Sequence, residues 1–285
     1  MRANYIPGQI ESATRRSAID FGSATPRRCS IDQALGRLTA VSAYSDYLYY
    51  LPVGFYHHGR DTYRLPRYIF LGPAANDDPV KLAFFATLHG DDEEGAKALV
   101  EFLLRLELEP DRATGYQLFI YPICNPTGFE DATPETRRGH DLRRELWNGS
   151  RQPEAYYLER ELGVLQFHGV AHLRASAGAL QGFRASASSP LLHGALVSPA
   201  LEAASKYLAC DGYRGRSEIV PAANVGRDHY EWGLVNPAEL KPAPFELIFE
   251  TARSAPPELR VKASVAALNR LLAEYRPFLA TQQNI

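Results

Sequence analysis

The sequence of 285 residues is poor in cysteine, has no long apolar run and carries no excess of charge of either sign. Its three cysteines, Cys29, Cys124 and Cys210, form no CxxC pair and are too few for a disulfide framework. Lysine and arginine number 31 against 33 acidic residues, a net charge of -2, so bulk charge favours neither nucleic acid nor a membrane as a partner. No apolar run approaches the ~18 residues that span a bilayer, and the first residues lack the apolar core of a secretory signal. We therefore expect a cytoplasmic protein that binds neither nucleic acid nor membranes.

Four common catalytic patterns are also missing. The sequence contains no GxGxxG and no GxxxxGK[ST], the glycine-rich loops of dinucleotide and nucleoside triphosphate sites. It contains neither the GxSxG turn of serine hydrolases nor the HExxH helix of many zinc proteases. Cys124 ends an apolar run and is expected to be a small core residue rather than a nucleophile. Any chemistry must therefore come from other residues.

Hydrophobic residues make up 45% of the chain and recur with two alternating patterns. Short apolar runs bounded by turn residues predict buried strands, and runs with apolar residues three and four apart predict helices. The predicted strands are 67–73, 81–90, 115–124, 169–176 and 245–252. The predicted helices are 30–43, 92–109, 153–166, 190–209 with a break at Pro199, and 256–280.

This alternation of strands and helices predicts the fold class. Crossover connections between strands give a mixed, mostly parallel, twisted sheet with helices on both faces, an α/β fold. We expect one such domain over 28–285, preceded by an irregular amino-terminal arm over 1–27. Because ligands of open α/β sheets bind at the carboxyl ends of the strands, the chemistry is expected just after those ends.

One of these strand ends carries a candidate metal ligand pair. His89 stands at the end of the strand 81–90, and Asp92 follows where the next helix begins. Imidazole nitrogen and carboxylate oxygen are both good zinc ligands. The alternative is that Asp91 and Asp92 only cap the helix, with Glu93 and Glu94 favouring its dipole.

Two further segments carry charged residues in unusual places. Residues 137–144 contain four arginines without a helical surface pattern, and guanidinium groups bind carboxylates in a bidentate manner. A solvated basic loop is the alternative. Strand 245–252 places Glu246 and Glu250 on one side of an apolar strand. A buried carboxylate must be paired, metal-linked or catalytic, so pairing with one of the arginines stays open.

Together these pieces resemble the zinc carboxypeptidases of the carboxypeptidase A type, especially their short bacterial members. The amidohydrolases that remove succinyl or acetyl groups from amino acids are similar through the same His and Asp-Leu-x-Arg pieces. The resemblance spans most of residues 55 to 280 and depends on the order and spacing of five pieces. These pieces are His89-Gly90-Asp91-Asp92 with Gly95, Asn125-Pro126-Thr127-Gly128, Arg137 with Asp141-Leu142-Arg143-Arg144, Pro153-Glu154-Ala155 and Phe249-Glu250-Thr251.

The resemblance implies a metal-dependent hydrolase that cleaves an amide bond next to a free carboxylate, in a peptide or an acylated amino acid. It implies one zinc ion held by His89, Asp92 and a third ligand, with Glu250 as the general base. Arg137 or its neighbour Arg138 would polarise the scissile carbonyl. Arg144, with Arg143 beside it, would hold the carboxylate of the substrate. The competing reading is a family member that has lost catalysis and binds anions or peptides.

The sequence departs from the family pattern at three positions. Asp92 stands where the family has Glu, and Arg143 replaces the Asn of an Asp-Leu-Asn-Arg motif. Arg174 aligns with the third metal ligand, whereas His172 lies two residues earlier on the same face of the strand and His168 lies further back. We expect a weakened site in which His172 is the third ligand and Arg174 turns aside to a carboxylate such as Glu250 or Asp92. If that rearrangement does not occur, we expect no metal at all.

Overall fold

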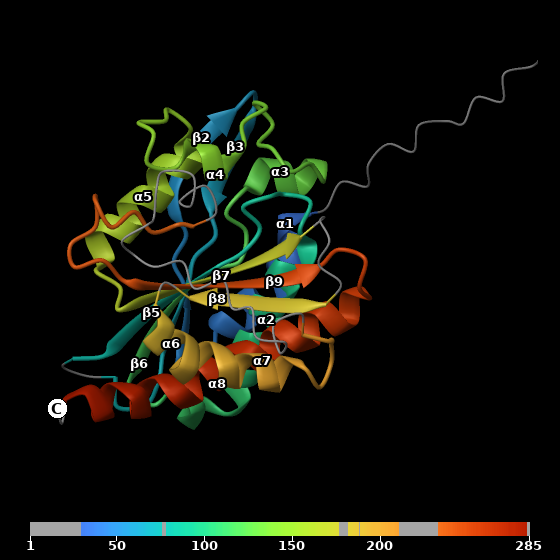
Figure 1. The fold of residues 1–285 in the computed structure, drawn as a ribbon. Helices are drawn as coiled ribbons and strands as arrows, with labels where there is room; N and C mark the ends of the chain where they lie inside the picture. Colours follow the sequence, from blue (N-terminus) through green and yellow to red (C-terminus); the bar gives the residue numbers. More distant parts are fainter. Residues whose placement is uncertain (1–29, 76–77, 177–181, 188, 211–232, 284–285) are drawn as a thin grey trace, which may run out of the picture.

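The computed structural model describes residues 30–75, 78–176, 182–187, 189–210 and 233–283. The predicted arm over 1–27 lies outside these residues, so its prediction stays open. The described chain forms one large sheet with helices on both faces, and a separate two-stranded hairpin lies at the top of the view (Figure 1).

The large sheet has seven strands in the order β1-β4-β6-β5-β7-β9-β8. The central strands β6, β5, β7 and β9 are parallel, whereas β4 and β8 run antiparallel to their neighbours. This is the predicted α/β fold with a mixed sheet, and the parallel centre brings the carboxyl ends of β5, β7 and β9 to one edge. The strands are β1 Leu48–Tyr50, β4 Tyr68–Leu71, β5 Val80–Phe85, β6 Tyr116–Tyr121, β7 Gly169–Ser176, β8 Phe183–Ala187 and β9 Phe245–Ala252.

The helices cover the two faces unequally. Helix α8 packs against α2 and α7 on one face, and α5 lies on the other (Figure 1). The helices are α1 Ile31–Ser42, α2 Glu93–Leu108, α3 Pro126–Asp131, α4 Leu142–Glu145, α5 Pro153–Leu165, α6 Pro190–Leu192, α7 Ser198–Ala204 and α8 Pro257–Gln283, with a 3-10 turn at Pro110–Ala113. No helix in the described part of the chain is both long enough and apolar enough to cross a membrane.

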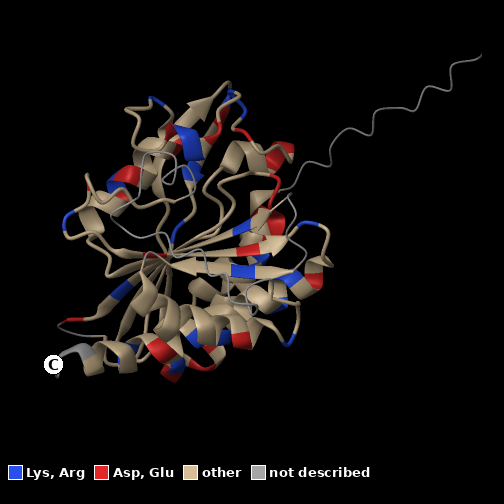
Figure 2. Ribbon diagram, in the orientation of Figure 1, with Lys and Arg blue, Asp and Glu red and all other residues tan. Residues whose placement is uncertain are grey.

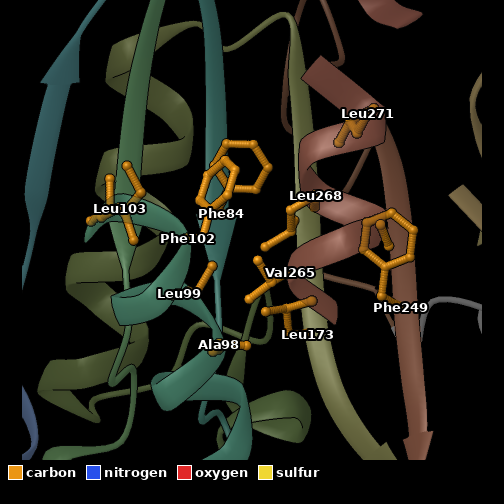
Figure 3. Packing of buried hydrophobic residues seen from close by; sticks show 14 of the residues in the cluster. Phe84, Ala98, Leu99, Phe102, Leu103, Leu173, Phe249, Val265, Leu268 and Leu271 are labelled. Carbon is orange, nitrogen blue, oxygen red and sulfur yellow. The ribbon is translucent and has the colours of Figure 1, made fainter. Parts of the chain in front are cut away.

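Charged and apolar side chains are well separated over most of the molecule. Figure 2 shows most Lys, Arg, Asp and Glu on the helices and loops, while the strands are mostly uncharged. The larger core lies between the sheet and the α2–α8 layer, where the ring of Phe84 of β5 meets that of Phe102 of α2, and Phe249 of β9 and Leu268 of α8 belong to the same buried cluster (Figure 3). Burial of these side chains, at roughly 25 cal/mol per Å² of apolar surface, holds the helices on the sheet.

Every predicted strand and helix in the described residues is present, with shifts of a few residues at the ends. The predicted break at Pro199 is wrong, because a π-helical turn over His193–Val197 joins α6 to α7 and Pro199 lies in the first turn of α7, where its missing N–H is not needed. The short strands β1 and β8, the helices α3 and α4, and the hairpin of β2 Val53–His58 and β3 Asp61–Leu65 were not predicted.

Candidate functional site

A small pocket lies at the carboxyl ends of β5 and β7, where the fold places ligands. Its volume is about 20 Å³, close to what one water molecule occupies. Four of the predicted site residues meet in its wall: His89, Asp92, Arg143 and His172. Together with four neighbours they define what we call the His172 pocket, lined by Leu88, His89, Asp92, Arg143, His172, Leu173, Arg174 and Ala175.

The loop that carries His89 is held in a strained conformation. Thr87 has a φ of +54°, a left-handed value that is unfavourable for a β-branched residue. A Cβ on Gly90 would lie 2.0 Å from the backbone of Gly128, so the loop packs directly on the Asn-Pro-Thr-Gly turn. Asn125 holds that turn, because its Oδ1 accepts from Gly128 N at 2.9 Å. Two motifs that are distant in the sequence therefore position His89 together.

Asp92 takes the N-cap position of α2, but its carboxylate is used elsewhere. It is 4% exposed, and its Oδ1 accepts from Nη2 of Arg260 at 3.1 Å. The same guanidinium donates to Glu94 Oε2 at 2.8 Å and to Thr251 Oγ1 at 3.0 Å. Burial raises the pKa of Asp92, and Arg260 counteracts that rise. A buried cation from α8 thus already balances this candidate metal ligand.

His172 has the most unusual environment in the site. It is 1% exposed, and neither Nδ1 nor Nε2 has a hydrogen-bond partner in the described part of the chain. Burial holds the pKa of His172 well below its usual range, and the positive charges of Arg174, Arg143 and His89 lower it further. Its imidazole is therefore neutral at physiological pH.

Glu250 is held between two arginines. Its neighbours in register are Arg174 on β7 and Arg184 on β8, so the three side chains form one row across three strands. Figure 2 shows this acidic position on β9 between basic positions on β7 and β8. Arg174 Nη2 lies 2.6 Å from Oε1, and Arg184 Nε donates to Oε2 at 2.6 Å. The sequence left Glu250 and Asp92 open as partners of Arg174, and the structure shows that the partner is Glu250. Glu250 is therefore held in ion pairs.

Asp141 connects the arginine-rich segment to His89. It is the N-cap of α4 and accepts from Arg143 N at 3.0 Å, while His89 Nε2 lies 3.5 Å from its Oδ1. Burial alone would raise the pKa of Asp141, but the hydrogen bonds from His89 and Arg143 outweigh it and lower the pKa below its usual range. Arg144 is 86% exposed and reaches Asp141 only at 3.9 Å, so its guanidinium is open to a ligand.

Arg137 and Arg138 lie outside the wall of the His172 pocket. Arg137 donates to Asp131 at 2.6 Å through Nε and to the Tyr63 hydroxyl at 2.6 Å through Nη1, which ties β3 to α3. Arg138 Nη2 donates to the carbonyl of His57 at 3.4 Å. Their predicted role on a scissile carbonyl stays a prediction.

Three arginines that matter here were missed from the sequence: Arg184, Arg253 and Arg260. Arg253 binds Asp91 in a bidentate manner, at 2.7 and 2.8 Å. Arg184 lies on a strand that was not predicted. Arg260 offered a signal, because it occurs among the apolar residues of an amphipathic helix and is buried with them.

The donor set of the His172 pocket does not fit a zinc ion in this arrangement. Within the described residues, no three His, Cys, Asp or Glu side chains gather so that they could hold a metal. An oxygen of Asp92 is bound to Arg260, and the guanidinium-bearing residues Arg143 and Arg174 share the wall with the two histidines. Each of these arginines is paired with a carboxylate outside the wall, Arg143 with Asp141 and Arg174 with Glu250. Zinc on His89, Asp92 and His172 therefore remains a prediction.

Comparison with known proteins places the fold. No protein family model and no curated protein sequence matches the chain. A metallo-carboxypeptidase from Burkholderia cenocepacia superposes with a TM-score of 0.64 at 16% identity, over 87% of this chain and 70% of that one. A metallo-carboxypeptidase from Pseudomonas aeruginosa, in complex with (2-guanidinoethylmercapto)succinic acid, gives 0.61 at 18% identity, over 86% and 69%.

A carboxypeptidase A from Helicoverpa armigera matches in the same way, with a TM-score of 0.61 at 13% identity, over 90% of this chain and 75% of that one. The chain has a zinc carboxypeptidase-like fold, as the sequence resemblance implied. At these identities the likeness is one of fold.

Proposed function

We propose that this protein uses a carboxypeptidase-like fold to bind a peptide or an acylated amino acid through its free carboxylate, without hydrolysing it. The observation that carries the proposal is the pairing of Glu250 with Arg174 and Arg184. A general base must turn an oxygen towards the water that it activates. Both oxygens of Glu250 accept from guanidinium groups instead. The residue in the position of the general base is therefore used in ion pairs and turns no free oxygen towards a water molecule.

The arginines at the rim supply the recognition of a carboxylate. Arg144 is exposed, and Arg138 lies exposed on the same segment. Guanidinium groups bind carboxylates through paired, charge-assisted hydrogen bonds. The Pseudomonas aeruginosa relative is in complex with a succinic acid derivative, a ligand with two carboxylates, which supports the same ligand class for this chain.

A metal-dependent hydrolase is the second candidate, and one observation favours it. His172 is a neutral, buried imidazole with neither nitrogen bonded among the described residues, which is the state in which histidine binds zinc. This function needs one zinc ion on His89, Asp92 and His172, Glu250 as base and Arg137 as electrophile. It also needs at least one oxygen of Glu250 to be released by its arginine.

Calorimetric titration of the full chain tests the proposal. We expect an N-acetylated dipeptide with a free carboxylate to bind at least tenfold more tightly than the same dipeptide as its amide, because one bidentate ion pair is lost. Arg144→Ala should weaken binding of the acid by a similar factor. Arg151→Ala, which removes the same charge from an exposed position, is the matched control and should leave binding unchanged.

Zinc-supplemented protein is then incubated with the same peptides, and the products are measured by mass spectrometry. We expect no cleavage and less than one zinc per ten chains after gel filtration. Cleavage that depends on zinc and disappears in Glu250→Gln would establish the hydrolase instead. Equal binding of the acid and the amide would reject carboxylate recognition.

A further inference from the structure

The β2–β3 hairpin has a β-bulge that turns Phe55 towards solvent. The register of β2 against β3 shifts between Val53 and Tyr56, and Gly54, which follows Val53, has a φ of +56°. Strict alternation along the strand would place Phe55 on the same side as Val53 and bury it. Because of the bulge, Tyr56 is buried instead and Phe55 is 62% exposed. The geometry of the strand therefore presents a large apolar ring to solvent.

Tyr157 of α5 fixes the backbone of Phe55 in this position. Its hydroxyl donates to the carbonyl oxygen of Phe55 at 2.9 Å and accepts from the Phe55 N–H at 3.3 Å. The Tyr157 ring also packs on Gly54, where an added Cβ would clash with it. Both backbone polar groups of Phe55 are thus bonded while its ring stays exposed. Because this backbone is already ordered, a ligand that packs on the ring loses little conformational entropy on binding.

His57 and Arg138 extend this surface towards the arginine-rich segment. The imidazole of His57 lies edge to face with the ring of Phe55, with the centroids 6.0 Å apart. Thr62 holds that imidazole, because its Oγ1 lies 3.0 Å from His57 Nδ1. Arg138 Nη2 donates to the carbonyl of His57 at 3.4 Å, which uses one of the five N–H donors of the guanidinium. We call the exposed residues Phe55, His57 and Arg138 the hairpin platform.

The hairpin platform combines two kinds of recognition at short range. Residues 55 and 57 are roughly 7 Å apart along the strand, and Arg138 is bonded to the second of them. Within the described residues Arg138 forms no ion pair, so its charge is available to a carboxylate. An exposed aromatic ring binds another ring through edge or offset stacking. A ligand that uses both contacts carries an aromatic group close to a free carboxylate.

We propose that the hairpin platform binds an aromatic group next to the free carboxylate of the ligand, with Arg138 on the carboxylate and Phe55 and His57 on the ring. This inference rests on the proposed function and adds a second recognised group to its ligand. The ring has two sources within the proposed ligand classes. It is either the side chain of the residue that carries the carboxylate or the acyl group on the nitrogen of that residue.

Three acids test the inference in calorimetric titrations of the full chain. N-acetylglycine has the carboxylate without a ring, N-acetylphenylalanine carries a ring on its side chain, and N-benzoylglycine carries a ring on its acyl group. We expect at least one ring-bearing acid to bind roughly fivefold more tightly than N-acetylglycine, because its ring leaves water and packs on Phe55. The ring-bearing acid that binds more tightly identifies the source of the ring.

Substitutions in the platform separate the contact with the ring from the contact with the carboxylate. Phe55→Ala should reduce the affinity for the ring-bearing acid to that for N-acetylglycine, whereas Phe55→Tyr, which keeps a ring, should preserve the preference. Tyr157→Phe removes the hydroxyl that fixes the Phe55 backbone and should lower the preference about twofold. Arg138→Ala should weaken binding of all three acids by a similar factor. Tyr44→Ala removes a 93% exposed ring outside the platform and is the matched control, which should leave every affinity unchanged.

The amides of the same three compounds distinguish failure of this inference from failure of the proposed function. If N-acetylglycine and its amide bind equally, carboxylate recognition is rejected, whatever the ring contributes. If the acids bind better than their amides but all three acids bind equally, the proposed function stands and the hairpin platform is rejected. An equal preference for a ring in wild type and in Phe55→Ala would also overturn the platform.

Discussion

Strand β9 carries two glutamates on one face, and the protein accommodates them in opposite ways. Glu250, at the carboxyl end, is held by the guanidinium groups of Arg174 and Arg184. Glu246, four residues earlier, accepts instead from backbone N–H groups, from Leu234 at 2.6 Å and from Val235 at 3.5 Å. The first carboxylate is balanced by charge and the second by dipoles.

Glu246 and Glu250 have different partners because they lie at different places along the strand β9 of the parallel sheet. Burial raises the pKa of Glu246 to about 7, and the backbone hydrogen bonds only partly oppose that rise. Charged side chains gather at the carboxyl ends of the strands, so Glu250 finds two cations there. Asp92 follows the same rule through Arg260. The carboxyl edge of the sheet is therefore a network of neutralised acids rather than a set of open metal ligands.

Removing Arg260 should give the largest effect on this network. We expect Arg260→Met to lower the free energy of unfolding by about 3–5 kcal/mol at pH 7, because it leaves the buried carboxylate of Asp92 without its cation. Urea denaturation measures the loss. The double variant Asp92→Asn with Arg260→Met should recover part of it, since the uncompensated charge is gone.

Arg270→Met is the matched control, because Arg270 pairs with Glu274 on the exposed side of the same helix. Its effect should stay below about 0.5 kcal/mol. If the two substitutions cost the same, Arg260 does not balance Asp92.

The substitution Glu250→Gln tests the ion pairs of Glu250 with Arg174 and Arg184. We expect a loss of about 2–3 kcal/mol at pH 7, because an amide cannot accept from both guanidinium groups and carries no charge. Arg184 is about half exposed, so solvent screens its share and Arg174 accounts for most of the loss. The free energy of unfolding from urea titration is the measurement, and a neutral result would mean that the row of three charges contributes nothing.

Much of the fold was predictable because its signals are local. The apolar runs of the central strands and the spacing in α2, α5 and α8 appear directly in the sequence. Strand alternation also placed Glu246 and Glu250 on one side of β9 correctly, since Leu247 and Phe249 belong to the opposite core. The short edge strands were not predictable, because three to five residues carry too little periodicity.

The site was only partly predictable, because its decisive contacts are between distant segments. His89, Asp92, Arg143 and His172 were expected near one sheet edge, and they line one pocket. The choice of Glu250 as the partner of Arg174 depends on the β7–β9 register, which no residue pattern shows. The partner of Asp92 comes from a helix 168 residues later in the chain. Ion pairs of this kind are fixed by tertiary packing.

Glu246→Gln should give the smallest and most pH-dependent effect. In the unfolded chain this carboxyl has its ordinary pKa of 4.5, and in the folded protein the pKa is about 7. The folded state therefore holds the proton more tightly, so the contribution of Glu246 to stability is complete below about pH 4.5 and is lost as the pH rises through 7. Gln keeps an oxygen for the backbone N–H groups and never ionises. We expect the variant to match wild type at pH 4 and to be more stable by about 1–2 kcal/mol at pH 8.

Urea denaturation of both proteins at pH 4, 6 and 8 measures this difference directly. Glu250→Gln in the same series provides the contrast, since it removes a carboxylate that is paired with cations and should be less stable than wild type at pH 8. If Glu246→Gln raises the free energy of unfolding at pH 8 and Glu250→Gln lowers it, then the negative charge of Glu246 destabilises the folded protein and that of Glu250 stabilises it. Equal signs would show that the backbone N–H groups of Leu234 and Val235 stabilise a carboxylate as well as two arginines do.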